Sequence, residues 1–199
     1  MMKRDDDYRL HNAWTAKSNY KNMKDWEEKF DVWTEYEDGT DVFNKWDTFP
    51  ESRKTIIAGD FWYKVTRSLF INSGLISEGA MSGKKKTPDH FVSPRMWYRA
   101  MMSTPDIREE MKNNKVKYAE SYLNLHTIVK VTKAENSEVR YKNRNHELTI
   151  PELTVDKYKK FRWFNGETGN FITEGTFPLE NLIPDWFTEY EKTLLVENV

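Results

Sequence analysis

Large apolar side chains recur every three or four positions in several stretches of the chain, which is the spacing of one helical face. In the N-terminal third, this spacing predicts a helix whose inward stripe consists of Met23, Trp26, Phe30 and Trp33. Packing alone requires such a stripe, so it indicates core rather than a base-stacking surface. The first twenty residues lack a clear period and predict a polar N-terminal arm.

Further helices are predicted on both sides of a glycine-rich stretch. Asp60 has the side chain of an N-cap, and it predicts the start of a helix that Gly74 closes. Residues 74–86 combine three glycines with small residues and predict a flexible loop or hairpin. Pro94 predicts a helix start, because proline is tolerated in the first helical turn, and Pro105 predicts another.

The pattern changes to that of a strand at residues 126–132, HTIVKVT, a short run rich in β-branched side chains. Thr132 and Glu135 then have the spacing of a capping box, in which a hydroxyl and a carboxylate bond each other's backbone amides. A helix is therefore expected to begin at Lys133, with Asn136 near its start.

In the last sixty residues, the segments 160–165 and 169–177 flank a Gly-Glu-Thr-Gly turn and predict a hairpin. Pro184 predicts the start of a final helix. The expected class is α+β: a mostly helical single domain over residues 21–199, with a small ββα-metal-like element and a C-terminal β-hairpin.

Composition narrows the class of protein. Hydrophobic residues make up 38% of the 199 residues and aromatic residues 15%, which is enough for a globular core. The chain has no cysteine, so disulfides, zinc ribbons and thiol nucleophiles are excluded and an intracellular, cytoplasmic protein is favoured. No stretch reaches the roughly 18 to 20 apolar residues of a membrane span, so no membrane partner is expected.

The formal net charge of -1 gives no global attraction to nucleic acid. Locally, residues 83–118 carry nine Lys and Arg against four Asp and Glu, whereas residues 1–60 carry ten against fourteen. A basic stretch of this kind indicates either a phosphate-binding surface or an ordinary solvated face.

This basic stretch includes Asp89-His90, a pair whose chemistry suits a metal-dependent nuclease. Histidine can take a proton from water because its ordinary pKa lies near neutrality. Carboxylate and amide oxygens, such as those of Asp89 and Asn136, are the ligands that Mg²⁺ prefers. An acid-His pair at a strand end, followed by a strand that leads into a helix bearing Asn, would assemble such a site.

These blocks, KKKTPDHFVSPR and TIVKVTKAENSEV, resemble the HNH-like (ββα-metal) endonucleases, in particular the short versions found in tailed phages. The resemblance covers residues 83–139. It implies a DNA endonuclease that uses Mg²⁺ or Mn²⁺ in the cytoplasm of a host bacterium. His90 would be the general base, Asp89 a metal ligand, and Asn136 the second ligand or a residue that orients the base.

The same resemblance implies that a group of cations lies beside the scissile phosphate, namely Lys84, Lys85, Lys86 and Arg95. His90 and Asn136 are 46 positions apart, so the intervening helices would form an insertion in the compact motif. His146 is the candidate for a third histidine of the site.

Two other interpretations stay open. His90 has the properties of a structural hydrogen-bonding residue, and Asn near a helix start is commonplace. The chain would then be a non-catalytic phage protein that binds nucleic acid, or a protein-interaction module whose Trp and Tyr side chains make the contact. Phosphate-cradling glycine motifs and the G-x-S-x-G elbow do not occur in the sequence.

Overall fold

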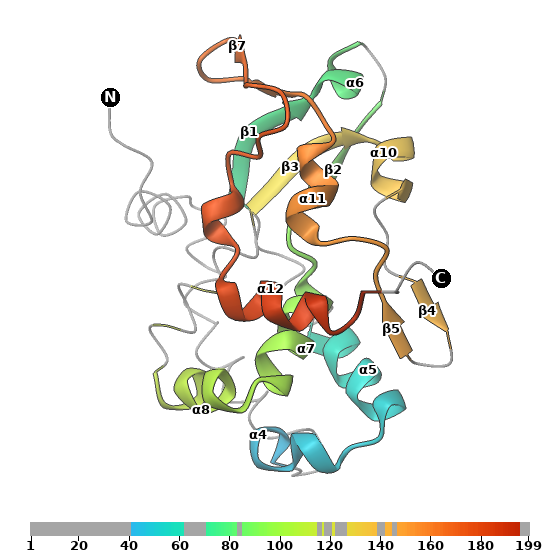
Figure 1. Cartoon of the computed structure of the whole chain (residues 1–199), viewed down its shortest axis with the longest axis vertical. Helices are drawn as coiled ribbons and strands as arrows, with labels where there is room; N and C mark the ends of the chain where they lie inside the picture. Colours follow the sequence, from blue (N-terminus) through green and yellow to red (C-terminus); the bar gives the residue numbers. More distant parts are fainter. Residues whose placement is uncertain are drawn as a thin grey trace. The chain divides into compact units, whose positions relative to one another are not determined.

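The computed structural model of the chain describes residues 41–61, 71–82, 85–114, 117, 121, 127–138, 142–144 and 147–195, and it is of the expected α+β class (Figure 1). These residues fall into two compact units. Unit 1 comes from residues 1–71 and 93–126, and unit 2 from residues 72–92 and 127–199. The chain passes between them three times, so neither unit is one continuous segment. Within the described residues, no helix is long and apolar enough to cross a membrane.

Unit 1 is helical in its described part. Pro94 and Pro105 occupy the first turns of two of its helices, as their sequence positions predict. The side chain of Asp41 caps the helix Val42–Lys45 by accepting a hydrogen bond of 2.9 Å from the backbone amide of Asn44. The elements of unit 1 are α4 (Val42–Lys45), the 3-10 helix η1 (Trp46–Thr48), α5 (Glu51–Asp60), α7 (Pro94–Ser103) and α8 (Pro105–Asn113).

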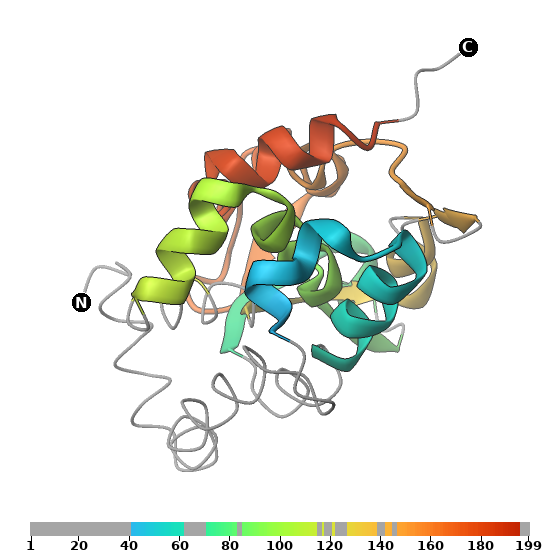
Figure 2. The same ribbon diagram turned by 90° about the horizontal axis from the view of Figure 1, so that it is seen from below.

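The core of unit 1 forms where α7 packs against α5, η1 and α8 (Figure 2). The ring of Tyr98 stacks on that of Phe61 at 4.2 Å and meets Trp46 edge-on at 5.8 Å. These aromatic side chains are fully buried, and each removes a large apolar area from water.

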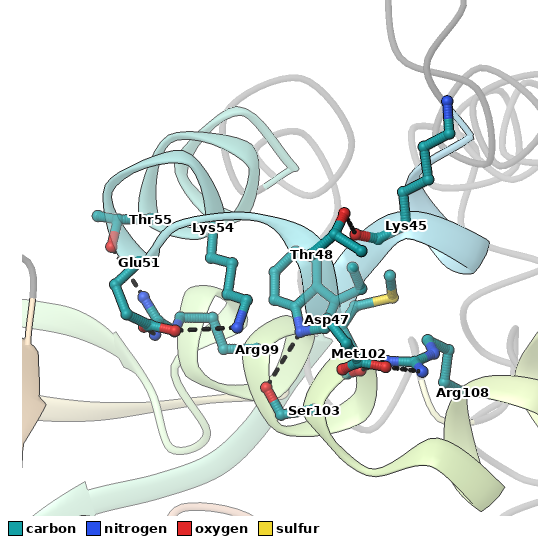
Figure 3. A network of polar contacts seen from close by, with 11 residues as sticks. Lys45, Asp47, Thr48, Glu51, Lys54, Thr55, Arg99, Met102, Ser103 and Arg108 are labelled. Atoms are coloured by element: carbon teal, nitrogen blue, oxygen red, sulfur yellow. Dashed lines mark hydrogen bonds and ion pairs between the residues drawn. The ribbon is translucent and has the colours of Figure 1, made fainter.

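A polar network ties the same helices together (Figure 3). Arg99 of α7 is only 5% exposed; it pairs with Glu51 and donates to the Thr55 hydroxyl at 2.8 Å. Arg108 of α8 donates to both carboxylate oxygens of Asp47, at 3.1 and 2.6 Å. These two arginines therefore link α7 to α5 and α8 to η1 within unit 1.

Unit 2 contains the β-structure. Of the described strands, five form a sheet in the order β2-β3-β1-β6-β7 and two form a separate pair. The strands of the larger sheet are β1 (Ile71–Ser77), β2 (Lys86–His90), β3 (Thr127–Thr132), β6 (Trp163–Asn165) and β7 (Asn170–Phe171), and the pair consists of β4 (Lys142–Arg144) and β5 (Glu147–Thr149).

The helices of unit 2 are short, and α11 lies across the β2–β3 part of the sheet in Figure 1. β6 and β7 pair antiparallel, which confirms the predicted C-terminal hairpin, and Pro184 precedes the last helix as expected. The helices are α6 (Glu78–Met81), α10 (Lys133–Glu138), α11 (Thr154–Lys159), the 3-10 helix η3 (Glu180–Leu182) and α12 (Asp185–Lys192).

The predicted capping box starts α10 directly after β3. The backbone amide of Glu135 donates to the Thr132 hydroxyl at 3.2 Å, and the Glu135 carboxylate accepts from the amide of Thr132 at 2.6 Å. The same carboxylate accepts from the Ser77 hydroxyl at 2.8 Å. A Cβ at Gly79 would lie 2.5 Å from the other Glu135 oxygen, so a larger residue there would displace the capping carboxylate.

Two sequence predictions are wrong. Asp60 is the last residue of α5 rather than the cap of a new helix, and Gly74 lies inside β1 with a φ of 76°. The predicted loop at 74–86 contains the end of β1, helix α6 and the start of β2. At Gly74 tertiary pairing overrides the local glycine signal, because the residues that follow it in β1, 75–77, pair with β6.

Other predictions lie outside the described residues. These are the polar arm at 1–20 and the helix with its aromatic stripe at 23–33. The proposed extent of the single domain, 21–199, therefore stays a prediction.

Candidate functional site

The Asp-His pair lies at the end of β2, in an antiparallel ladder with β3. His90 pairs with Ile128 and Asp89 with Val129, while Lys86 at the other end pairs with Thr132. α10 follows β3 without a loop and packs against both strands. Strand, strand and helix thus occur in the order that a ββα-metal element requires.

Strand geometry assigns the two members of the pair to different faces. Successive side chains of a strand point to opposite sides, and directly paired residues share a side. Asp89 therefore shares a face with Val129, which is fully buried, whereas His90 shares the other face with Ile128. The two side chains do not approach a common point from one face of β2.

Asp89 is engaged by a helix that covers its face of the sheet. The hydroxyl of Tyr158 on α11 donates to Asp89 Oδ2 at 2.6 Å and lies 3.3 Å from the backbone carbonyl oxygen of His90. The Tyr158 ring is fully buried and stacks on Phe177 at 5.0 Å, with its own carbonyl accepting from Trp163 Nε1 at 2.9 Å. This side of β2 is therefore tied into the core of unit 2.

A buried lysine and a buried glutamate lie near Asp89 and Tyr158. Lys157 is 8% exposed, and its ammonium lies 4.5 Å from the centre of the Tyr158 ring. Burial lowers the pKa of Lys157, against the attraction of the carboxylates of Asp89 and Glu191 and of a third carboxylate on Glu152. We call Asp89, Lys157, Tyr158 and Glu191 the inner cluster.

Glu191 of α12 anchors the helix that carries Tyr158. Its carboxylate is fully buried and accepts from the hydroxyl of Thr154 and from the Thr154 backbone amide, at 3.1 and 3.3 Å to its two oxygens. It thus caps α11, whose N-cap residue Leu153 makes no side-chain cap. Burial raises the pKa of Glu191, although the Thr154 hydrogen bonds favour its ionised form.

His90 differs from Asp89 in its surroundings and its titration. Its side chain is partly buried, and this burial lowers the pKa of the imidazole, while the charge of Asp89 acts in the opposite direction. The imidazole is therefore neutral at neutral pH, which is the form that a general base needs.

The register separates His90 from the start of α10. α10 begins after Thr132, which pairs with Lys86, so the helix starts four residues of ladder away from His90, about 14 Å at the usual strand rise. Asn136 lies on that helix and is partly exposed. In the described part of the chain, no group of three His, Cys, Asp or Glu side chains could hold a metal ion. The ligand pair of Asp89 and Asn136 stays a prediction that the register does not favour.

The cations expected beside a phosphate are distributed over both units. Lys85 and Lys86 are exposed at the start of β2. Arg95 belongs to unit 1 and is exposed on α7, with its guanidinium lying beside Gly59 of α5. Lys84 and His146 lie outside the described residues.

Sequence reasoning missed Lys157, Tyr158 and Glu191 of the inner cluster and one lysine of β3. Lys130 pairs with Pro88 and so lies on the same face as Lys86 and His90. The period of two in TIVKVT separates Lys130 from the buried valines, but the register was needed to place it beside β2. For Tyr158 and Glu191 there is no local signal, because their partners are 69 and 37 positions away.

Neither protein-family models nor curated proteins nor solved structures match this chain.

Proposed function

We propose that the protein is an HNH-like DNA endonuclease that hydrolyses phosphodiester bonds at the β2–β3–α10 element. The observation that carries this proposal is the position of His90. It ends the first strand of an antiparallel pair whose second strand leads directly into a helix, and its lowered pKa keeps the imidazole in the basic form.

In the proposed reaction, neutral His90 accepts a proton from a water molecule. The water oxygen forms a new bond to phosphorus while the bond from phosphorus to the leaving oxygen breaks. The leaving oxygen takes a proton from solvent, and the imidazolium returns its proton to water. Lysines of β2 would hold the backbone of the substrate without reading its sequence.

A divalent cation, Mg²⁺ or Mn²⁺, would stabilise the charge on the phosphate when bound. The residues around His90 do not form a ready ligand set. The Asp89 side chain lies on the other face of β2 from His90, and its Oδ2 accepts from Tyr158, so this carboxylate is not placed to hold an ion beside His90. Asn136 is the remaining proposed ligand.

Cleavage of supercoiled plasmid tests the proposal directly. Wild-type protein and His90→Ala are compared at equal concentration with Mg²⁺, with Mn²⁺ and with a chelator. We expect cleavage by the wild type that the chelator abolishes, and a loss of at least about a hundredfold in the variant, the usual effect of removing a general base.

His126→Ala is the matched control, because it removes a histidine that the proposal does not use. Its cleavage should equal that of the wild type. Equal cleavage by His90→Ala would exclude His90 as the base and would point to another site or to a contaminating nuclease.

The second candidate function is nucleic-acid binding without hydrolysis. It is favoured by the engagement of Asp89 in the inner cluster, on the opposite face of β2 from His90. The protein-interaction alternative has less support, since three of the described tryptophans, Trp46, Trp97 and Trp163, are buried rather than gathered on a surface.

A further inference from the structure

The outer face of the β2–β3 ladder carries three basic side chains in a row. Lys86, Lys130 and His90 alternate between the two strands, and Lys130 lies diagonally between the other two because it pairs with Pro88. Diagonal neighbours in an antiparallel pair are separated by about 7 to 8 Å. We call Lys86, Lys130 and His90 the outer row.

The row lies at an edge of the larger sheet. β2 is the terminal strand in the order of the described strands, and both Lys86 and Pro88 are exposed. Lysine and proline on an edge also discourage pairing with another strand. The edge is therefore unsuited to recruiting a β-strand and open to a ligand of opposite charge.

The charges of the two lysines of this row are not paired inside the described structure. Among the residues that the structure describes, Lys86 and Lys130 form neither an ion pair nor a side-chain hydrogen bond. By contrast, Lys159 pairs with Glu180 and Lys192 with Glu189, each at 2.7 Å.

We propose that the outer row binds the sugar–phosphate backbone of a nucleic acid, with Lys130 as a phosphate contact next to Lys86. The assignment rests on the proposed function for the choice of nucleic acid as ligand. A nucleic-acid strand carries a negative charge about every 3.4 Å along its axis, so lysines at diagonal spacing can each meet a phosphate. His90 at the end of the row would then face the bound backbone.

Binding in a chelator, where cleavage does not occur, tests this inference apart from catalysis. The affinity of a fluorescent 20-base-pair duplex is measured by anisotropy from about 50 to about 200 mM salt. The wild-type affinity should fall steeply with salt. In the double variant Lys86→Ala/Lys130→Ala, the slope of log affinity against log salt should decrease in magnitude by about 2, roughly one per lost phosphate contact.

The control removes two lysines that already have acidic partners. Lys159→Ala/Lys192→Ala changes the net charge by the same amount, and its slope and affinity should equal those of the wild type. Lys130→Arg keeps the charge and should bind like the wild type. Thermal unfolding confirms that each variant is folded, as expected for substitutions outside the core.

Three results would overturn the inference: no binding by the wild type, a wild-type slope in the double variant, or an equal loss in the control. Equally tight binding of polyglutamate would replace nucleic acid by an acidic polypeptide as the ligand. Binding that depends on the outer row, without any cleavage in Mg²⁺ or Mn²⁺, would confirm this inference and overturn the proposed endonuclease.

Discussion

The two faces of β2 differ in almost every physical respect, although their residues alternate along one short strand. The inner face joins the half-buried Asp89 to the buried Tyr158, and the buried Lys157 and Glu191 belong to the same cluster of unit 2. The outer face carries Lys86 of β2 and Lys130 of β3. The charges of these two lysines have no acidic partner among the described residues.

This difference shows that two residues adjacent in sequence do not act on the same ligand once they lie in a regular strand. Asp89 and His90 are neighbours in sequence, yet the pleat of the strand sends them to opposite sides. The inner face should therefore govern stability, and the outer face should govern binding. Substitutions on each face test this division.

The largest loss of stability is expected for Glu191→Ala. The change leaves the buried amide and hydroxyl of Thr154 without their acceptor and removes a counter-charge of Lys157, which together should lower the free energy of unfolding by about 3 kcal/mol. Urea unfolding measures the change.

Glu189→Ala is its matched control on the same helix. Glu189 is exposed and pairs only with Lys192, so its removal should change the free energy of unfolding by less than about 0.5 kcal/mol. Equal losses of unfolding free energy in Glu191→Ala and Glu189→Ala would show that the buried cap does not stabilise the fold more than an exposed ion pair does.

A smaller loss, about 1 to 2 kcal/mol, is expected for Tyr158→Phe, because the change deletes one hydrogen bond to a carboxylate and keeps the packed ring. Urea unfolding should detect it, while the salt dependence of DNA binding should remain that of the wild type. Tyr190→Phe on α12 serves as the control. A Tyr158→Phe protein with full stability but weaker DNA binding would contradict the division between the faces.

The pH dependence of stability should reveal the raised pKa of Glu191. Between the ordinary value of 4.5 and the raised value, the folded state binds more protons than the unfolded state. The stability contributed by this shift is thus full below pH 4.5 and is lost as the pH rises through the folded-state pKa. The unfolding free energy of the wild type should therefore fall, relative to Glu191→Gln, as the pH rises through this window. A constant difference, or one that grows with pH, would refute the assignment.

The smallest effect on stability is expected for Lys130→Ala, within about 0.5 kcal/mol of the wild type, because the side chain has no partner among the described residues. Thermal and urea unfolding provide the measurement. A loss above 1 kcal/mol would mean that Lys130 belongs to the structural framework rather than to a binding surface.

Much of the local structure could be predicted from the sequence where the signal is local. The capping box at Thr132, the helix starts at Pro94 and Pro105, and the strand at 127–132 follow from the preferences of a few adjacent residues. The strand β1 was missed because its glycine suggested a loop, whereas long-range pairing with β6 decides its conformation.

The candidate site was predictable only in part, for the same reason. The sequence singles out His90 by its chemistry and its neighbours, but the face on which it lies follows from its pairing with Ile128. Likewise, the sequence identifies Asp89 as a candidate carboxylate ligand, but its hydrogen bond from Tyr158 depends on the fold. Contacts between residues tens of positions apart carry no local pattern.

The division between the two faces is tested most directly by measuring cleavage and stability together for Asp89→Asn and His90→Gln. We predict that His90→Gln loses plasmid cleavage while its free energy of unfolding stays within about 1 kcal/mol of the wild type. Asp89→Asn should lose about 1 to 2 kcal/mol and retain cleavage while folded. The opposite pattern, with a stable Asp89→Asn protein that does not cleave and an active His90→Gln protein, would contradict the account.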